Sequence, residues 1–218
     1  MCDTAAASVP YAGLTAWSAL QCVSPGDRVL VVGGAGGVGT LVTQILAKHY
    51  QCHVTVLAAE SHHGHLIKLG ATNVMDNRTD PDAVKDMDKI DVVLDCAGLG
   101  IERISSVINL DKLVTGGSVV SLSSPMLSNT DKYGLIQGTL CSMQTLLQYN
   151  MTSCRYSTKW AFFQPDSRAL DILGKLVEQK IVLPTVSEVF NFDNSPGAYQ
   201  AVEDGSVCGK IVIDMSSL

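Results

Sequence analysis

Five glycines fall within seven residues of this 218-residue chain, in the segment 33–39 (GGAGGVG). Three of them, Gly34, Gly36 and Gly39, have the spacing GxGxxG. Glycine suits this chemistry because a side chain would hold the backbone away from a diphosphate, whose charge is stabilised by the free N–H groups at the start of a helix. The spacing predicts a dinucleotide-binding turn, with a purely structural turn as the alternative. The residues that would form it are Gly34, Ala35, Gly36, Gly37, Val38 and Gly39.

The segments on either side of the turn are the ones that such a site requires. In residues 28–32 (RVLVV) a continuous apolar run follows an arginine. Pro25, Gly26 and Asp27 precede the segment and glycines end it, which predicts a strand buried on both faces. After the turn, apolar residues recur at helical spacing from Val38 to Leu46, which predicts an amphipathic helix. The motif alone is a weak signal, but its position between a strand and a helix makes it specific.

The end of the next strand bears on which nicotinamide dinucleotide would bind. In NAD sites an acid about 20 residues after the glycines binds the ribose 2′-hydroxyl. Here Ala58 and Ala59 stand at that place, and the nearby Glu60 is interpreted as a solvated loop charge. Without an acid the site would admit a 2′-phosphate, to which residues 61–63 (SHH) offer donors. The pattern favours NADPH over NADH, with Ala59 and Ser61 at the adenosine end.

Along the rest of the chain, predicted strands alternate with predicted helices. The further strands are expected at residues 53–59, 90–94, 118–122, 160–163 and 210–213. The further helices are expected at residues 66–69, ending at Gly70, at 104–113, at 170–177 after an Asp166 cap, and beyond Ser195 as the cap before Pro196. Residues 129–153 are interpreted as short helices and loop. This alternation predicts an α/β fold with a doubly wound parallel sheet.

Composition excludes several classes of function. The net charge is −6 without a run of lysine or arginine, which argues against a nucleic-acid partner. No apolar stretch approaches the ~18 residues of a membrane span. The seven cysteines include no CxxC pair, which indicates a reducing compartment without a disulfide framework. Residues 61–65 (SHHGH) lack carboxylate or thiolate partners at ligand spacing, so no metal site is predicted. A small-molecule partner fits best.

Four segments resemble quinone-reductase-like medium-chain dehydrogenases/reductases: residues 9–17 (VPYAGLTAW), 26–39 (GDRVLVVGGAGGVG), 69–72 (LGAT) and 208–213 (CGKIVI). The resemblance implies three parts, namely an inter-domain helix at 1–24, an NAD(P)-binding Rossmann domain at 25–180, and a segment at 181–218 that returns to a GroES-like catalytic domain. That GroES-like domain is expected to be missing from this chain. The implied enzyme is zinc-independent and transfers hydride from NADPH to a small-molecule electron acceptor, a quinone or conjugated carbonyl.

The resemblance also implies roles for individual residues. Gly36, Gly37 and Val38 would lie against the diphosphate. The nicotinamide half would lie along a set of strand-end residues, namely Leu94, Asp95, Ala97, Ser121 and Ser123. Asn77 stands where relatives often carry a tyrosine that packs on the adenosine. No catalytic residue is assigned, and Tyr11 and Thr15 are the only weak candidates near the domain junction.

Residues 155–163 (RYSTKWAFF) resemble a mitochondrial branch of that family. This implies a mitochondrial location, although the chain contains no targeting segment and would otherwise be cytoplasmic. It also implies a reticulon-type membrane protein as a partner, and the family in general suggests a homodimer. One alternative is a catalytically inactive, truncated module that binds nucleotide or protein. A methyltransferase with a similar turn is disfavoured because it would need an acid near Ala58.

Overall fold

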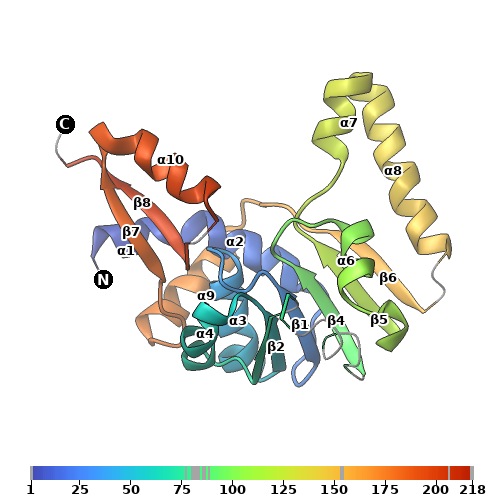
Figure 1. Cartoon of the computed structure of the whole chain (residues 1–218), viewed down its shortest axis with the longest axis horizontal. Helices are drawn as coiled ribbons and strands as arrows, with labels where there is room; N and C mark the ends of the chain where they lie inside the picture. Colours follow the sequence, from blue (N-terminus) through green and yellow to red (C-terminus); the bar gives the residue numbers. More distant parts are fainter. Residues whose placement is uncertain are drawn as a thin grey trace.

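The computed structural model describes residues 2–76, 78, 79, 84, 87, 89–152, 155–205 and 207–216. Its central sheet has six parallel strands in the order β3-β2-β1-β4-β5-β6 (Figure 1). Their bounds are β1 Arg28–Val32, β2 His53–Leu57, β3 Asn73–Met75, β4 Ile90–Asp95, β5 Leu113–Ser121 and β6 Tyr156–Trp160. The chain runs outward in both directions from β1 and β4, which confirms the predicted doubly wound α/β fold.

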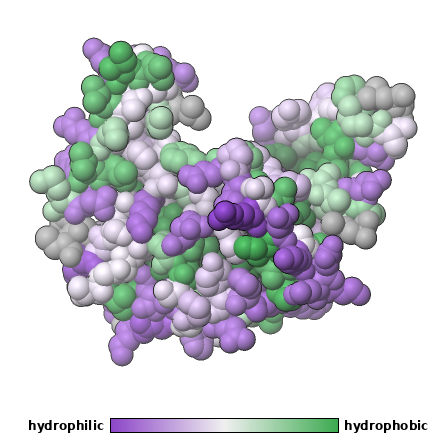
Figure 2. Space-filling view, turned by 180° about the vertical axis from the view of Figure 1, so that it is seen from behind, coloured by the Kyte–Doolittle hydropathy of each residue, from purple (hydrophilic) through white to green (hydrophobic). Residues whose placement is uncertain are grey.

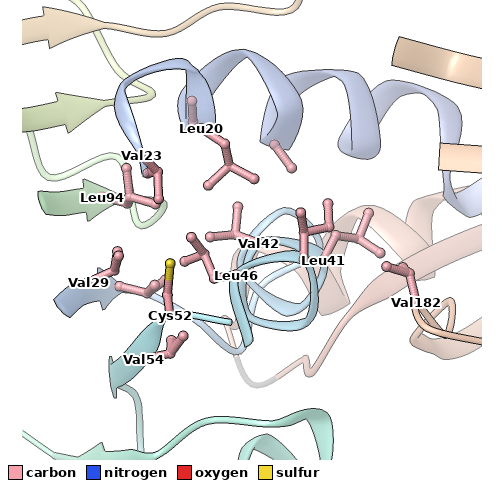
Figure 3. Packing of buried hydrophobic residues seen from close by; sticks show 14 of the residues in the cluster. Leu20, Val23, Val29, Leu41, Val42, Leu46, Cys52, Val54, Leu94 and Val182 are labelled. Atoms are coloured by element: carbon pink, nitrogen blue, oxygen red, sulfur yellow. The ribbon is translucent and has the colours of Figure 1, made fainter. Parts of the chain in front are cut away.

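Alternation along the strands gives the sheet two apolar faces. In β1, Val29 and Val31 point into one core cluster, whereas Leu30 and Val32 point into the other. Figure 3 shows the first cluster, where Leu41, Val42 and Leu46 of the helix after the glycine turn pack on β1 and β2. All four residues from Val29 to Val32 are buried, so the prediction of a strand covered on both faces is confirmed.

Helices cover both faces of this sheet. Their bounds are α1 Asp3–Ser8, α2 Pro10–Ala19, α3 Gly39–Gln44, α4 His63–Leu69, α6 Ile101–Val107, α7 Met126–Tyr133, α8 Leu135–Thr152, α9 Ser167–Glu178 and α10 Ser195–Glu203. Helix α3 continues as a π-helical turn over Ile45–His49. Gly70 ends α4 in the left-handed conformation, and the Asp166 carboxylate accepts from two N–H groups of α9, as predicted. No helix in the described part of the chain combines the length and apolar character needed to span a bilayer.

The structure differs from the sequence-based prediction in three segments of the main domain. The predicted helix at 104–113 ends at Val107, and Leu113 already begins β5, because its side chain belongs to the core beneath the sheet. The predicted strand at 160–163 lies earlier, at Tyr156–Trp160, where it pairs with β5. Residues 129–153, interpreted as short helices and loop, contain most of α7 and the 18-residue helix α8.

A second, two-stranded parallel sheet stands apart from the first. It pairs β7 (Val186–Asn191) with β8 (Lys210–Asp214), and α1 and α10 lie against it at the left of Figure 1. The N-cap of α10 is Asn194 instead of the predicted Ser195, which is the first helical residue. The buried Gln44 side chain bonds both the N–H and the carbonyl of Leu183, which ties this part to the main core. The domain limits at 24 and 180 stay a prediction.

Candidate cofactor-binding site

A cavity of about 580 Å³ opens beyond the carboxyl ends of β1 and β4, and residues from the loops that follow both strands line it. This is the place where ligands bind in doubly wound sheets, because the two strands send their following loops to opposite sides. Six residues predicted as cofactor contacts line it, namely Ala35, Gly36, Gly37, Val38, Ala59 and Ala97. The glycine turn thus lies in one wall of the cavity.

The glycines of the turn have different roles. An ideal Cβ on Gly39 would overlap the carbonyl oxygen of Gly33 and lie 2.6 Å from Cα of Gly34, so Gly39 lets the helix start close to the strand. For a Cβ on Gly36, the nearest atom outside residues 35–37 would be the carbonyl oxygen of Gly33, 3.6 Å away. The protein therefore has room for a side chain at position 36, which lines the cavity. The absence of that side chain keeps the backbone accessible to a ligand.

The C-terminal part of the chain also lines this cavity. The N–H of Gly209 donates to the carbonyl of Ala35 at 2.8 Å, and Gly209 forms an isolated parallel bridge with Gly36. Gly209 has a φ of +95°, and a Cβ there would overlap the carbonyl of Thr185. The adjacent Lys210 packs its methylene stem over Gly37 and lines the cavity. The two distant segments are therefore joined through their backbones at the mouth of the turn.

Two cations line the cavity, Arg78 and Lys210, together with His62. Among the described lining residues there is no carboxylate. The Arg78 side chain is 69% exposed and is held by Asp76, whose oxygens accept from Nε at 3.1 Å and from a terminal nitrogen at 2.9 Å. These bonds hold the pKa of Asp76 well below its usual range. A cavity with this lining suits a ligand rich in phosphate.

Asp95 organises the loop at the end of β4. Its carboxylate is fully buried and accepts from the N–H groups of Leu99 (3.1 Å) and Gly100 (2.8 Å) and from the hydroxyl of Ser121 (2.8 Å). The Ser123 N–H donates to the same Ser121 hydroxyl. Asp95 and Ser121 therefore shape the loop from Cys96 to Gly100 instead of presenting their side chains to the cavity, and Leu94 is fully buried in the core.

The residues predicted at the adenosine end differ in whether they line the cavity. Ala58 and Ala59 line the cavity, whereas Ser61 is exposed and outside its lining, and His62 takes that place. Glu60 is exposed as well, in agreement with its interpretation as a solvated charge. Asn77 lies outside the described residues. Contacts of Ala59, Ser61 and Asn77 with a cofactor therefore stay predictions.

A second, more polar cavity of about 710 Å³ adjoins the first across the Cys96–Gly100 loop. Ser123, Trp160 and Tyr149 line it, and the Tyr149 hydroxyl donates to Glu102 at 2.8 Å. Burial, together with this bond, raises the pKa of Tyr149 to about 12. Ser123 thus faces a different cavity from the one lined by the glycine turn.

The two weak catalytic candidates are both engaged in local contacts. Tyr11 stacks on Phe163 with ring centroids 4.8 Å apart and an angle of 14° between the planes. The Thr15 hydroxyl is nearly buried and donates to the carbonyl of Tyr11, one turn earlier in α2. Neither residue lines the glycine-turn cavity.

Metal ligands do not assemble in the described residues, since no group of three histidine, cysteine, aspartate or glutamate side chains there could hold an ion. In the segment 61–65 the ring of His63 instead contacts the carbonyl of Ala58 through Nε2 at 3.2 Å. Cys96 lines the first cavity, and burial raises the pKa of its thiol to about 12, so the sulfur stays protonated at neutral pH.

Sequence reasoning missed Arg78 and Lys210. Lys210 belongs to the CGKIVI segment, whose pattern indicated only a closing strand, and no local signal connects it with Gly37. Arg78 follows Asp76 by two residues, a spacing at which an arginine can bond a carboxylate that precedes it. A search for cations after the third strand would have found Arg78. The position of Lys210 beside the glycine turn could be found only from the tertiary structure.

Comparison with known proteins identifies the family to which the chain is related. The NAD(P)H oxidoreductase RTN4IP1, mitochondrial, of Danio rerio is 36% identical over 96% of this chain, and reticulon-4-interacting protein 1, mitochondrial, of Caenorhabditis elegans is 29% identical over 95%. The quinone oxidoreductase of Coxiella burnetii superposes over 96% of the chain with a TM-score of 0.75 at 30% identity. The chain spans 56%, 59% and 60% of these three proteins respectively. Residues 69–213 match the model of the zinc-binding dehydrogenase family, and the chain belongs to that family.

Proposed function

We propose that this chain is the cofactor-binding part of an NADPH-dependent oxidoreductase of the quinone-reductase type, which transfers hydride to a quinone or a conjugated carbonyl. One observation carries the proposal. At the switch point of a doubly wound sheet, a cavity combines an accessible glycine backbone with Arg78 and Lys210 and with no carboxylate among its described lining residues. The printed names of the relatives, NAD(P)H oxidoreductase and quinone oxidoreductase, support the reaction type.

The residues of this chain would bind and orient the cofactor. The diphosphate would lie over Gly36 and Gly37, with the Lys210 ammonium as its counter-charge, and the 2′-phosphate would lie near Arg78 and His62. The nicotinamide, which supplies the hydride, would lie toward the loop that Asp95 holds in place. Negative charge that develops on the acceptor oxygen needs a positioned donor, and we assign that role to no residue of this chain.

The family description includes zinc, and the described residues do not fit that ion. They bring no three ligand side chains together, and the His63 ring contacts a backbone carbonyl. We therefore derive no step through a metal. By analogy with the names of the relatives, we further propose a mitochondrial location and a reticulon-type membrane protein as a partner.

A titration of the purified chain tests the proposal. Quenching or enhancement of nicotinamide fluorescence should give an NADPH affinity at least about tenfold tighter than that for NADH, a difference of about 1.4 kcal/mol. S-Adenosylmethionine should not bind. Oxidation of bound NADPH by a quinone would support the proposed oxidoreductase activity. Binding without oxidation would indicate that this chain acts as a nucleotide-binding module. If no dinucleotide binds, the proposal fails.

Arg78 is expected to set the preference for the phosphorylated cofactor. Arg78→Met should weaken NADPH binding about tenfold and leave NADH binding within about twofold, because only NADPH carries the 2′-phosphate. Isothermal titration calorimetry measures both affinities. Arg168→Met, which removes an exposed arginine at the start of α9, is the matched control. Equal losses for the two cofactors would place Arg78 at a different phosphate.

Lys210 is expected to act on both cofactors alike. Lys210→Met keeps most of the stem that packs over Gly37 but removes the ammonium. Affinities for NADPH and NADH should both fall about five- to tenfold, and the loss should shrink at high salt because the charge is then screened. Lys175→Met on α9 removes an exposed charge elsewhere and serves as the control. A loss that does not change with salt would argue against a charge contact.

A further inference from the structure

The imidazole of His62 lines the glycine-turn cavity and has no partner among the described residues. His62 ends the short 3-10 helix Glu60–His62, is half-buried, and lines the cavity together with Arg78. Its ring makes no hydrogen bond, ion pair or ring contact with any described residue, whereas the neighbouring His63 ring contacts the carbonyl of Ala58. The His62 ring is therefore available to a ligand in the cavity.

The place of His62 in the fold indicates which part of a dinucleotide it would meet. It follows the carboxyl end of β2 at Leu57 by five residues. In doubly wound sheets the adenosine ribose of a dinucleotide lies near the end of this second strand. Lys210, in contrast, packs over Gly37 in the glycine turn, where the diphosphate would lie. His62 and Arg78 would thus face the ribose 2′ position, at which NADPH carries a phosphate and NADH a hydroxyl.

The two groups at this position respond differently to pH. The guanidinium of Arg78 keeps its charge throughout the neutral range, so it attracts a 2′-phosphate equally at every pH. An imidazole gains or loses its charge between about pH 5 and pH 8. The strength of the attraction exerted by His62 therefore depends on whether its ring holds a proton.

Charged or titratable groups also stand on the elements next to His62 and around the cavity. They are Glu60 on the same turn, His63, His65 and Lys68 on α4, Asp76 and Arg78 after β3, Cys96 after β4, Glu203 and Asp204 at the end of α10, and Lys210 in β8. Carboxylates, lysine and arginine keep their charge between pH 7 and pH 8.5. The thiol of Cys96 stays protonated there, because burial raises its pKa to about 12. Among the described lining residues, only His62 changes charge in this range.

Helices α7 and α8 add no charge to this site. In Figure 2 they form the projection at the upper left, and a hollow separates them from the part at the upper right, which contains β7, β8 and α10. Val202 and Lys210 of the latter part line the cavity, but no described residue of α7 or α8 does. The titratable groups of these two helices therefore lie outside the surroundings of His62.

We propose that His62 binds the 2′-phosphate of NADPH as an imidazolium, so that NADPH binding takes up a proton from solvent and NADH binding does not. This inference rests on the proposed function. A phosphate dianion in contact with an imidazole favours its charged form, and the hydrogen bond between them is then charge-assisted. Because the NADPH complex holds more protons than its separate components, the affinity for NADPH rises as the pH falls toward neutrality.

The expected size follows from proton linkage. If imidazolium binds the phosphate about tenfold more tightly than the neutral ring, an imidazole of ordinary pKa takes up about 0.4 proton per NADPH near pH 7.2. The affinity for NADPH then rises about threefold from pH 8.5 to pH 7. The phosphate itself titrates near pH 6 and acts in the opposite direction, because neighbouring cations favour its dianion. That effect dominates only below roughly pH 6.

Isothermal titration calorimetry of the whole chain measures the proton directly. Heats of NADPH and NADH binding at about pH 7.2 are compared in PIPES and in Tris, whose ionisation enthalpies differ and which contain no competing phosphate. NADPH should take up about 0.4 proton and NADH less than about 0.1. Tight NADPH binding without proton uptake, or equal uptake with both dinucleotides, would overturn this inference and leave the proposed function standing. Binding of neither dinucleotide would overturn both.

Three variants assign the proton to its residue. His62→Gln should abolish the uptake and weaken NADPH binding at pH 7 about threefold, with NADH binding within about twofold. His65→Gln removes an exposed imidazole of α4 that does not line the cavity, and it should behave as the unmodified chain. His62→Lys keeps a charge at all these pH values, so at pH 8.5 it should bind NADPH several-fold more tightly than the unmodified chain, without proton uptake. Undiminished uptake by His62→Gln would exclude His62 as the proton acceptor.

Discussion

Replacing Gly36 with alanine is expected to weaken NADPH binding about a hundredfold while the thermal midpoint stays within about 2 °C of the unmodified chain. Outside residues 35–37, the nearest protein atom to the new methyl group would be the carbonyl oxygen of Gly33 at 3.6 Å, so the fold accommodates it. It would, however, lie at the cavity and hold a diphosphate away from the backbone. Two lost charge-assisted hydrogen bonds at about 1.5 kcal/mol each account for the size of the effect.

Gly39→Ala is the matched comparison, since both variants add one methyl group to the same turn. At position 39 the methyl group would overlap the carbonyl of Gly33, so the helix would have to move away from the strand. This variant should lose several degrees of thermal stability as well as binding. Fluorescence titration and differential scanning calorimetry on both proteins separate the two effects. Normal NADPH binding by Gly36→Ala would show that the diphosphate lies elsewhere.

Replacing Asp95 with alanine is expected to reduce the free energy of unfolding by about 3 to 5 kcal/mol. The change removes the acceptor of three hydrogen bonds, from Leu99, Gly100 and Ser121, and leaves a cavity at a fully buried position. Urea denaturation followed by circular dichroism measures the loss. If this cavity binds the cofactor as proposed, NADPH affinity should fall as well, because the released loop lines the glycine-turn cavity through Cys96 and Ala97.

Ser121→Ala provides the control for this second prediction. It removes one donor to Asp95 and leaves the other two, so a loss of about 1 kcal/mol is expected. In the double variant the two effects should not add, because the side chains share one hydrogen bond. Additive losses, or an Asp95→Ala protein as stable as the unmodified chain, would contradict the role of Asp95 as the organiser of this loop.

The sequence predicted those parts of the fold whose signals are local. The run from Val29 to Val32 is apolar because the strand is covered on both faces, and its pattern and length suffice to identify it. The glycine turn is recognisable because its GxGxxG spacing stands between a strand and a helix, although among its glycines only Gly39 has its close steric neighbours within the turn. The Asp166 side chain accepts from the N–H groups of Arg168 and Ala169, which are close to it in the sequence, so the start of α9 was predicted as well.

The parts that were wrong or missed depend on distant contacts. The segment of helix α8 was predicted only as short helices and loop, because several of its large apolar side chains are exposed and small or polar residues such as Gly138 and Ser142 make its inner contacts. Leu113 matched helical spacing with Ile104, but packing beneath the sheet placed it in a strand. Lys210 reaches the glycine turn only because Gly209 bonds Ala35, a contact between residues far apart in the sequence.

That bond between Gly209 and Ala35 has a consequence for synthesis on the ribosome. The glycine turn and its helix can form early, since β1 and α3 are adjacent in the chain. The lining residues from the C-terminal part of the chain, including Lys210, can reach the cavity only after residues 207–211 have left the exit tunnel. A nascent chain would therefore contain all six strands of its central sheet before it could retain a dinucleotide, and the dinucleotide would bind and stabilise only chains in which β8 has already paired with β7.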